Sequence, residues 1–168
     1  MAEVILICGK ICSGKTTYAQ KLCRQRSAVL LSVDEIMLAM FGQHCGDMHD
    51  TYAERTRNYL LEKAVQLHRD GIDTVLDWGF WTGEGRKSTA AFFRERGIPY
   101  RFILIDISEE TWKARLEKRN RDVLNGDVSA YYVDENLAAK FELRFEMPEE
   151  EEIDIRITET ADCCAITG

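Results

Sequence analysis

The chain has 168 residues, of which 45% are hydrophobic and 30% charged, and its net charge is −7. This composition is typical of one globular domain and excludes disorder over most of the length. It also disfavours binding to a nucleic-acid backbone, although a local basic cleft would still permit such a partner. No apolar run approaches the ~20 residues of a membrane span, and Met1–Cys8 lacks a signal's basic flank, so we expect a cytoplasmic protein without a membrane partner.

Apolar runs alternate with stretches of helical periodicity along the first half of the chain. Residues 4–8 form a continuous apolar run, which is typical of a strand buried on both faces of a parallel sheet. The spacing of apolar residues between 51 and 70 predicts a long amphipathic helix that Gly71 ends. In chain order, the predicted elements are a strand at 4–8, a helix at 14–26, a strand at 28–32, a helix at 34–40 and a helix at 51–70.

The second half of the chain continues this alternation. Its predicted elements are a strand at 72–77, a helix at 84–96, a strand at 100–107, a helix from 109 to the segment 120–126, a helix at 134–145 and a strand at 153–157. Alternating strands and helices indicate a three-layer α/β/α fold around a five-stranded parallel sheet. We therefore predict a single domain over residues 1–158, followed by a flexible C-terminal tail over 159–168.

A glycine-rich segment joins the first predicted strand to the first helix. Gly9–Thr16 matches the pattern G-x-x-x-x-G-K-[ST] of a phosphate-binding loop, or P-loop, in the required strand-to-helix context. Its glycines let backbone N–H groups face phosphate oxygens, and the helix adds the positive end of its dipole. The motif predicts ATP and Mg2+ as cofactors, with Lys15 on the β- and γ-phosphates and Thr16 on the magnesium ion. The predicted nucleotide-binding residues are Gly9, Cys12, Ser13, Gly14, Lys15, Thr16 and Thr17.

An aspartate follows the second predicted strand. Ligands of open α/β sheets gather at the carboxyl ends of the strands, which is where Asp34 lies. A kinase needs such a carboxylate to accept the proton of the attacking hydroxyl and to help hold the water shell of magnesium. The alternative is that Asp34 merely occupies the favourable first turn of the helix that follows. Spacing alone does not decide between these two hypotheses.

Four segments occur in an order that is characteristic of one family. They read G-x-x-C-S-G-K-T-T, L-L-S-V-D-E-I, V-L-D-W-G-F-W and R-L-E-K-R-N-R. Over residues 3–157 the chain therefore resembles the P-loop kinase-like ATP-binding proteins, which include zeta toxins, chloramphenicol phosphotransferase and polynucleotide 5′-kinase domains. The resemblance implies a P-loop kinase with Asp34 as its catalytic base.

Two arginines lie four residues apart in the last of these segments. Arg115 and Arg119 would project from one face of a helix and could hold one anion together. Because P-loop kinases carry such a pair on a mobile lid, the resemblance implies a small helical lid around 108–130, in which both arginines are catalytic. The alternative is a surface helix with ion pairs such as Glu117 with Arg121 and Lys118 with Asp122.

Three further residues are candidates on the strength of their positions. Asp77 is expected to end the strand at 72–77, where its carboxylate could support the magnesium site. The aromatic turn that follows contains Trp81, which could bind substrate or simply belong to the core. Arg86 lies where related proteins place an arginine directed at phosphate or substrate.

The predicted function is transfer of the γ-phosphate of Mg-ATP to a hydroxyl group of an acceptor. The acidic chain favours a small-molecule acceptor over the 5′-end of a polynucleotide. The alternative is a nucleotide-binding switch or slow ATPase that has no phosphoryl acceptor. A GTPase switch would normally carry an N-K-x-D element, which this sequence lacks, so the kinase hypothesis is preferred.

Overall fold

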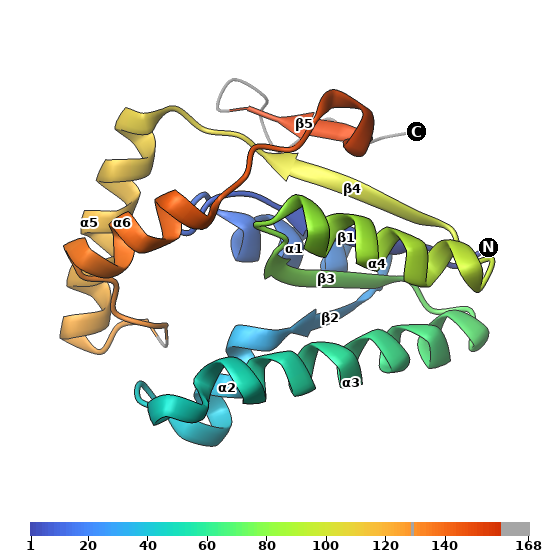
Figure 1. Cartoon of the computed structure of the whole chain (residues 1–168), viewed down its shortest axis with the longest axis horizontal. Coiled ribbons are helices and arrows are strands. Elements are labelled where there is room, and N and C mark those ends of the chain that lie inside the picture. The colour runs from blue at the N-terminus through green and yellow to red at the C-terminus, as the bar shows by residue number, and fades with distance from the viewer. Residues whose placement is uncertain (129, 159–168) are drawn as a thin grey trace.

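Five parallel strands form one central sheet in the order β2-β3-β1-β4-β5 (Figure 1). The computed structural model describes residues 1–128 and 130–158, so the tail predicted at 159–168 lies outside the described residues. The strands are β1 (Val4–Cys8), β2 (Val29–Ser32), β3 (Thr74–Gly79), β4 (Tyr100–Ile105) and β5 (Ile155–Ile157). The predicted five-stranded parallel sheet is thus confirmed.

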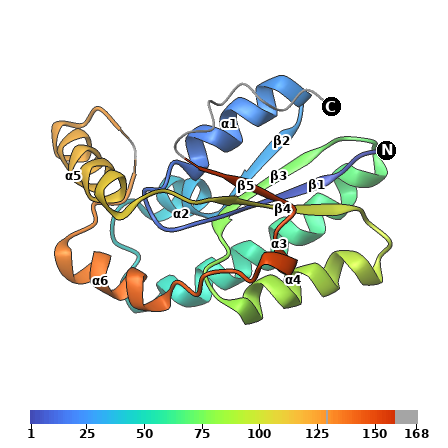
Figure 2. The ribbon, with the colours of Figure 1, turned by 90° about the horizontal axis from the view of Figure 1, so that it is seen from above.

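Helices cover both faces of this sheet. They are α1 (Lys15–Arg26), α2 (Val33–Phe41), α3 (His49–Arg69), α4 (Gly83–Glu95), α5 (Glu109–Asn125) and α6 (Glu135–Arg144). Figure 2 shows α1 on one face and α3 with α4 on the other, which confirms the predicted three-layer α/β/α fold. Helices α5 and α6 lie beyond the carboxyl ends of the strands (Figure 1).

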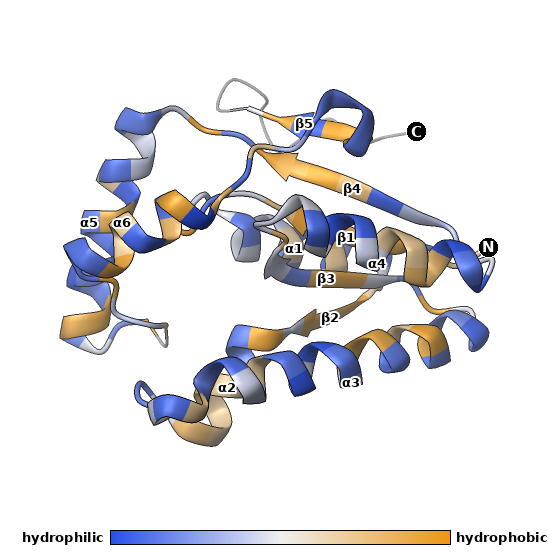
Figure 3. Ribbon diagram, viewed as in Figure 1, coloured by the Kyte–Doolittle hydropathy of each residue, from blue (hydrophilic) through white to orange (hydrophobic). Residues whose placement is uncertain are grey.

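The core is divided between the two faces of the sheet by the alternation of side chains along each strand. In β1, Val4, Leu6 and Cys8 face the layer of α2, α3 and α4, whereas Ile5 and Ile7 face α1. Every residue of β1 is at most 1% exposed, and Figure 3 shows the apolar strands between helices with polar outer faces. Burial on both faces explains why the sequence of β1 is continuously apolar rather than alternating.

Strand β3 lies two residues further along the chain than the predicted strand at 72–77. Gly71 adopts a positive φ of 77°, and the Ile72 N–H donates to the Leu67 carbonyl, so these residues belong to the end of α3. At the other end, Gly79 pairs with Cys8 across a bulge in the sheet. Trp78 and Gly79 are therefore strand residues, and the prediction that they form a turn is wrong.

The other boundaries differ from the predictions by small amounts. Helix α3 begins at His49 rather than at 51, because a 3₁₀ turn at Gly46–Met48 leads directly into it. A second 3₁₀ turn at Glu150–Glu152 precedes β5, which starts at Ile155 rather than at 153. Within the described ranges, no helix combines the length and apolar character needed to cross a membrane.

Candidate active site

The P-loop has a backbone conformation that requires glycine at two positions. Gly9 adopts a φ of 150°, and a Cβ atom there would lie 2.7 Å from the carbonyl oxygen of Ile105. Gly14 adopts a φ of 100°, and a Cβ atom there would lie 2.9 Å from Nη1 of Arg115. Side chains at these positions would be strained by both the dihedral angle and the close contacts. The two glycines of the motif thus allow the loop to curl tightly against β4 and α5.

Lys15 holds its ammonium group inside the curled loop. Its Nζ donates a hydrogen bond of 2.7 Å to the carbonyl oxygen of Lys10, at the opposite side of the loop. Desolvation lowers the pKa of Lys15, although the nearby carboxylates of Asp77 and Asp34 oppose this shift. Helix α1 begins at Lys15, so the positive end of its dipole faces the same space. Its first turn contains no acidic residue that would offset this positive potential. This arrangement suits the binding of phosphate groups.

Thr16 and Asp77 form a polar pair beside the P-loop. The hydroxyl group of Thr16 donates a hydrogen bond of 2.7 Å to Oδ2 of Asp77, whose residue is only 4% exposed. The contact exists because β3 is the neighbour of β1 in the sheet. Across residues 1–128 and 130–158, no cluster of three or more His, Cys, Asp or Glu residues could hold a metal ion. A hydroxyl and one or two carboxylates nevertheless fit Mg2+, which draws its remaining ligands from water and phosphate.

Asp34 stands in the first turn of α2, at the edge of the same cleft. The helix is capped by Ser32, whose Oγ accepts a hydrogen bond of 3.3 Å from the Glu35 N–H. The carboxylate of Asp34 is open to the cleft, but the surrounding walls desolvate it and raise its pKa, against the opposing effect of Lys15. Asp34 lies in the first turn of a helix and also faces the P-loop lysine, so its position agrees with both hypotheses, and its role as a base stays a prediction.

Both predicted lid arginines reach the P-loop. Arg115 donates a hydrogen bond of 2.5 Å from Nη1 to the carbonyl oxygen of Ser13. Arg119 donates from Nη1 to Sγ of Cys12 at 3.3 Å, and its buried Nε has no hydrogen-bond partner in the described part of the chain. The predicted spacing on one face of α5 therefore brings two guanidinium groups to the loop that would hold the phosphates.

Helix α5 is also anchored on the P-loop by an aromatic side chain. Trp112 is 5% exposed, and its Nε1 donates a hydrogen bond of 2.7 Å to the carbonyl oxygen of Ile11. The alternative of a surface helix also describes part of α5, where Lys118 and Asp122 form an exposed ion pair of 2.5 Å beside the two arginines. Sequence reasoning missed Trp112, although a lone tryptophan four residues after a helix cap is a signal for an anchor.

Residues 130–133, here called the strap, connect α5 to the other side of the cleft. The side chain of Asn120 on α5 donates a hydrogen bond of 2.6 Å to the Val133 carbonyl oxygen and accepts one of 3.0 Å from the Val133 N–H. The side chain of Gln43, which follows α2, donates a hydrogen bond of 2.7 Å to the Ala130 carbonyl oxygen and accepts one of 3.2 Å from the Tyr132 N–H. Two amide side chains thus fix the strap between α5 and the α2–α3 connection.

A cleft of about 2340 Å³ opens between these elements. One side is the P-loop with the start of α1, and a second, which contains the predicted lid, runs from α5 to α6. The third, here called the α2–α3 wall, runs from Val33 to Leu61 and carries the carboxylates of Asp34, Glu35, Asp50 and Glu54 with the guanidinium group of Arg57. The predicted site residues that line the cleft are Cys12, Ser13, Gly14, Lys15, Thr16, Thr17, Asp34, Asp77, Trp81, Arg115 and Arg119.

Trp81 lines the cleft without being a freely projecting platform. Its ring lies over the backbone of Gly79 and packs against Phe141 of α6, with ring centroids 4.7 Å apart. The Nε1 atom is buried and has no hydrogen-bond partner within the described ranges. Trp81 therefore packs against other aromatic residues, as the core alternative expected, and also borders the cleft; that it binds substrate stays a prediction.

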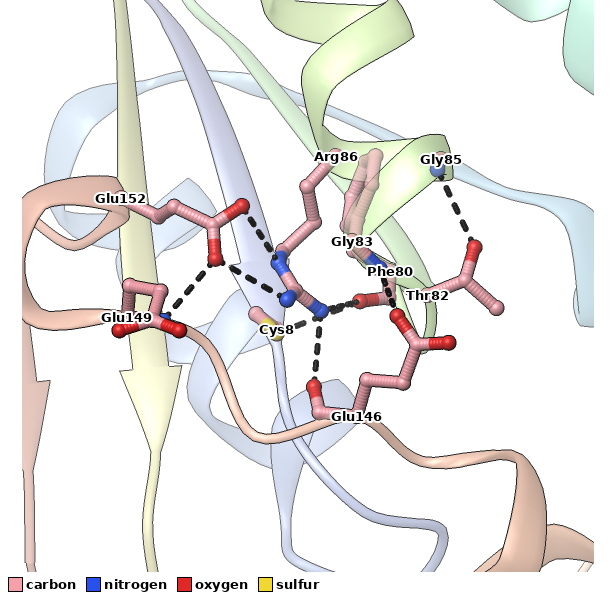
Figure 4. Close-up of polar contacts among 9 residues, drawn as sticks. All are labelled: Cys8, Phe80, Thr82, Gly83, Gly85, Arg86, Glu146, Glu149 and Glu152. Atoms are coloured by element: carbon pink, nitrogen blue, oxygen red, sulfur yellow. Dashed lines mark hydrogen bonds and ion pairs between the residues drawn. The ribbon is translucent and has the colours of Figure 1, made fainter.

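Arg86 does not face the cleft, contrary to the expectation that it points at phosphate or substrate. Only 2% of the residue is exposed, and its guanidinium group forms two hydrogen bonds with the carboxylate of Glu152, at 3.2 and 3.0 Å (Figure 4). Its Nη1 donates to the carbonyl oxygens of Phe80 and Glu146 at 3.1 and 2.9 Å. The physical reason is that Glu152, 66 residues away in the sequence, neutralises and occupies the guanidinium group.

A protein-family model described as an AAA domain matches residues 4–148. No curated protein matches the sequence. Solved structures with a similar fold include the APS kinase of Mycobacterium tuberculosis in complex with AMPPNP and APS. That structure has a TM-score of 0.68 and 16% identity, with 96% of this chain and 91% of that chain covered.

Two further structures share the fold. A sugar kinase from a Janibacter species has a TM-score of 0.65 and 18% identity, covering 94% of this chain and 86% of the kinase. A chain of an RNA repair complex has a TM-score of 0.69 and 17% identity, covering 85% of this chain but 43% of that longer chain. At these identities the likeness shows a common fold, which is that of P-loop kinases.

Proposed function

Because the chain belongs to the AAA domain family of P-loop kinase-like proteins, we propose that it transfers the γ-phosphate of ATP to a hydroxyl group of a small molecule. The observation that carries this proposal is the convergence of Asp34, Lys15 and the two lid arginines on one cleft. A nucleotide-binding protein needs the P-loop alone. A kinase also needs a base beside the γ-phosphate and a lid that excludes water.

The P-loop side of the cleft would bind the nucleotide. Backbone N–H groups between Gly9 and Thr17 and the start of α1 would face the phosphate oxygens. Lys15 would exchange its hydrogen bond with the Lys10 carbonyl for contacts with the β- and γ-phosphates. Thr16 and Asp77 would hold a magnesium ion, with Asp34 near its water shell, and this ion would neutralise phosphate charge.

Asp34 would act as the base on the opposite side of the γ-phosphate. Its carboxylate would take the proton of the acceptor hydroxyl while the acceptor oxygen forms a bond to the γ-phosphorus. The bond between this phosphorus and the β–γ bridging oxygen breaks, and ADP leaves with the electron pair. Arg115 and Arg119 would stabilise the negative charge on the transferring group from the lid helix.

The charge of the α2–α3 wall favours an acceptor that is not strongly anionic. This wall contributes four carboxylates to the cleft, from Asp34, Glu35, Asp50 and Glu54, against one guanidinium group, that of Arg57. A polynucleotide end would bring several phosphates to this surface and would be repelled. A neutral or cationic small molecule with a hydroxyl group fits the wall better.

The test is transfer of label from [γ-³²P]ATP with Mg2+ to a panel of acceptors. The panel contains glucose, gluconate, kanamycin, uridine and a 5′-hydroxyl oligonucleotide, and Lys15→Ala is the inactive control. We expect label on a neutral or cationic small molecule with the unmutated protein, and none with the control. Release of labelled phosphate to water alone would instead favour a slow ATPase, and label on the oligonucleotide would contradict the small-molecule acceptor.

A further inference from the structure

The strap brings one side chain from the lid side of the cleft to the α2–α3 wall. Tyr131 lies between Ala130 and Tyr132, whose backbone groups form hydrogen bonds with the side chain of Gln43, and Asn120 holds the nearby Val133. Its ring meets the edge of the His49 ring, with centroids 6.1 Å apart, and it packs against the core formed under α2 and α3. The strap thus carries an aromatic side chain across the cleft to the wall that contains Asp34.

The hydroxyl group of Tyr131 is buried, and no described residue forms a hydrogen bond with it. Burial raises the pKa of the phenol, and the negative charge of Asp34 raises it further, so the hydroxyl stays protonated at neutral pH and lies within electrostatic range of the proposed base. A buried donor without an acceptor is costly for a protein and is uncommon unless water, an ion or a ligand completes it.

We propose that Tyr131 binds the phosphoryl acceptor, with its hydroxyl donating a hydrogen bond to a polar atom next to the acceptor hydroxyl that Asp34 deprotonates. This inference rests on the proposed kinase function and adds an acceptor-binding residue on the lid side of the cleft. The two amide clamps hold the strap to α5 and to the α2–α3 connection. The acceptor site is therefore complete only when the lid helix and the α2–α3 wall are joined.

This arrangement links acceptor selection to closure of the lid. Arg115 and Arg119 lie on the helix to which the strap is tied by Asn120. An acceptor that forms a hydrogen bond with Tyr131 stabilises the state in which the strap joins α5 to the α2–α3 wall. It thereby also stabilises the contacts of Arg115 and Arg119 with the P-loop. A water molecule bound at Asp34 alone would not favour this joined state, so this linkage favours transfer to the acceptor over hydrolysis.

The test is Tyr131→Phe, which removes the hydroxyl and keeps the packed ring. Tyr59→Phe is the matched control, because Tyr59 lies on α3 outside the cleft and is 60% exposed. Transfer from [γ-³²P]ATP is measured for glucose, gluconate, kanamycin and uridine, with separate determination of KM for ATP and for each acceptor. We expect Tyr131→Phe to raise the acceptor KM about tenfold, with the KM for ATP unchanged and the melting temperature equal or higher, because the variant no longer carries a buried donor without an acceptor.

Three outcomes would be distinguishable. A raised acceptor KM in Tyr131→Phe and an unchanged one in Tyr59→Phe supports the inference. Acceptor KM values that stay unchanged in Tyr131→Phe, or KM values for ATP that rise equally, would overturn it while leaving the kinase function intact. Failure of the unmutated protein to phosphorylate any of the panel would overturn the proposed function, and the inference with it.

Discussion

The arginines of α4 and α5 show how differently the same side chain can be used. Arg86 is 2% exposed and is held by Glu152 and two carbonyl oxygens, whereas Arg115 and Arg119 extend from α5 to the P-loop. Arg86 joins the start of α4 to the segment before β5 and stabilises the fold. The lid arginines are held by single contacts and remain available to a phosphate.

The largest effect expected from this contrast is on stability. Arg86→Met removes the guanidinium group and leaves the carboxylate of Glu152 and two carbonyl oxygens without their partner. Breaking a fully buried ion pair costs about 3–5 kcal/mol, and because the Glu152 side chain is 17% exposed we expect the free energy of unfolding to fall by an amount near the lower end of this range. Chemical denaturation measures it, and the kcat of the remaining folded protein should change little.

If Arg86→Met instead abolished transfer without loss of stability, Arg86 would be a substrate-directed residue after all. Arg94→Met on the same helix is a suitable control, since that side chain is exposed and its hydrogen bond to Tyr100 lies at the surface. Surface substitutions of this kind normally change stability by less than about 0.5 kcal/mol.

For the arginines of the proposed lid we expect the opposite result, a large loss of activity with little change in stability. Arg119→Ala removes a positive charge that contacts the P-loop, and kcat should fall about 10²- to 10³-fold, as when one donor to a developing negative charge is lost. The melting temperature should stay close to that of the unmutated protein. Steady-state kinetics measures the first quantity and calorimetry the second.

Arg121→Ala provides the matched control for the lid. Arg121 belongs to the same helix but is exposed and does not line the cleft. Its substitution should leave kcat near the value of the unmutated protein. Equal losses in Arg119→Ala and Arg121→Ala would mean that general charge, rather than contact with the phosphates, explains the effect.

A smaller effect is expected at Gln43, which holds the strap. Gln43→Ala removes two exposed hydrogen bonds, to Ala130 and Tyr132, that are each worth about 0.5–1.5 kcal/mol at most. The acceptor KM should rise a few-fold while the KM for ATP stays unchanged. An unchanged acceptor KM would show that the strap keeps its place without this clamp.

The smallest effect concerns the pH dependence of stability. The hydrogen bonds from Arg86 hold the pKa of Glu152 below its ordinary value of 4.5. The pair therefore adds stability above about pH 4.5, and this contribution is lost as the pH falls through the lowered pKa of the folded state. In Glu152→Gln, the deficit in unfolding free energy should shrink as the pH falls below 4.5. A deficit that stays constant in this range would contradict the assignment.

The features that the sequence predicted correctly are those with local causes. The apolar run of β1 and the glycines of the P-loop specify a buried strand and a tight turn through short-range sterics and burial alone. The alternation of elements then leaves few topologies, so the five-stranded sheet and its layers could be predicted. The spacing of Arg115 and Arg119 likewise predicted that they share a helix face.

The features that could not be predicted depend on distant partners. The direction of Arg86 is set by Glu152, and the strap is held by Gln43 and Asn120. Glu152 and Gln43 belong to no motif, and the motif that contains Asn120 does not indicate its contact with Val133. Tyr131 lies in a segment without helical or strand pattern, so its place beside His49 depends on the hydrogen bonds that hold the strap to Gln43 and Asn120. Long side chains and irregular segments are positioned by tertiary contacts, which a local pattern does not encode.

The central claim, that Asp34 activates an acceptor hydroxyl beside bound ATP, is tested most directly with Asp34→Asn. Single-turnover transfer from [γ-³²P]ATP to the preferred acceptor is compared with ATP affinity, measured by equilibrium binding. We predict that transfer falls about 10²- to 10⁴-fold, the usual contribution of a general base, while ATP affinity is retained. Transfer at the rate of the unmutated protein would contradict the account and would remove Asp34 from the reaction.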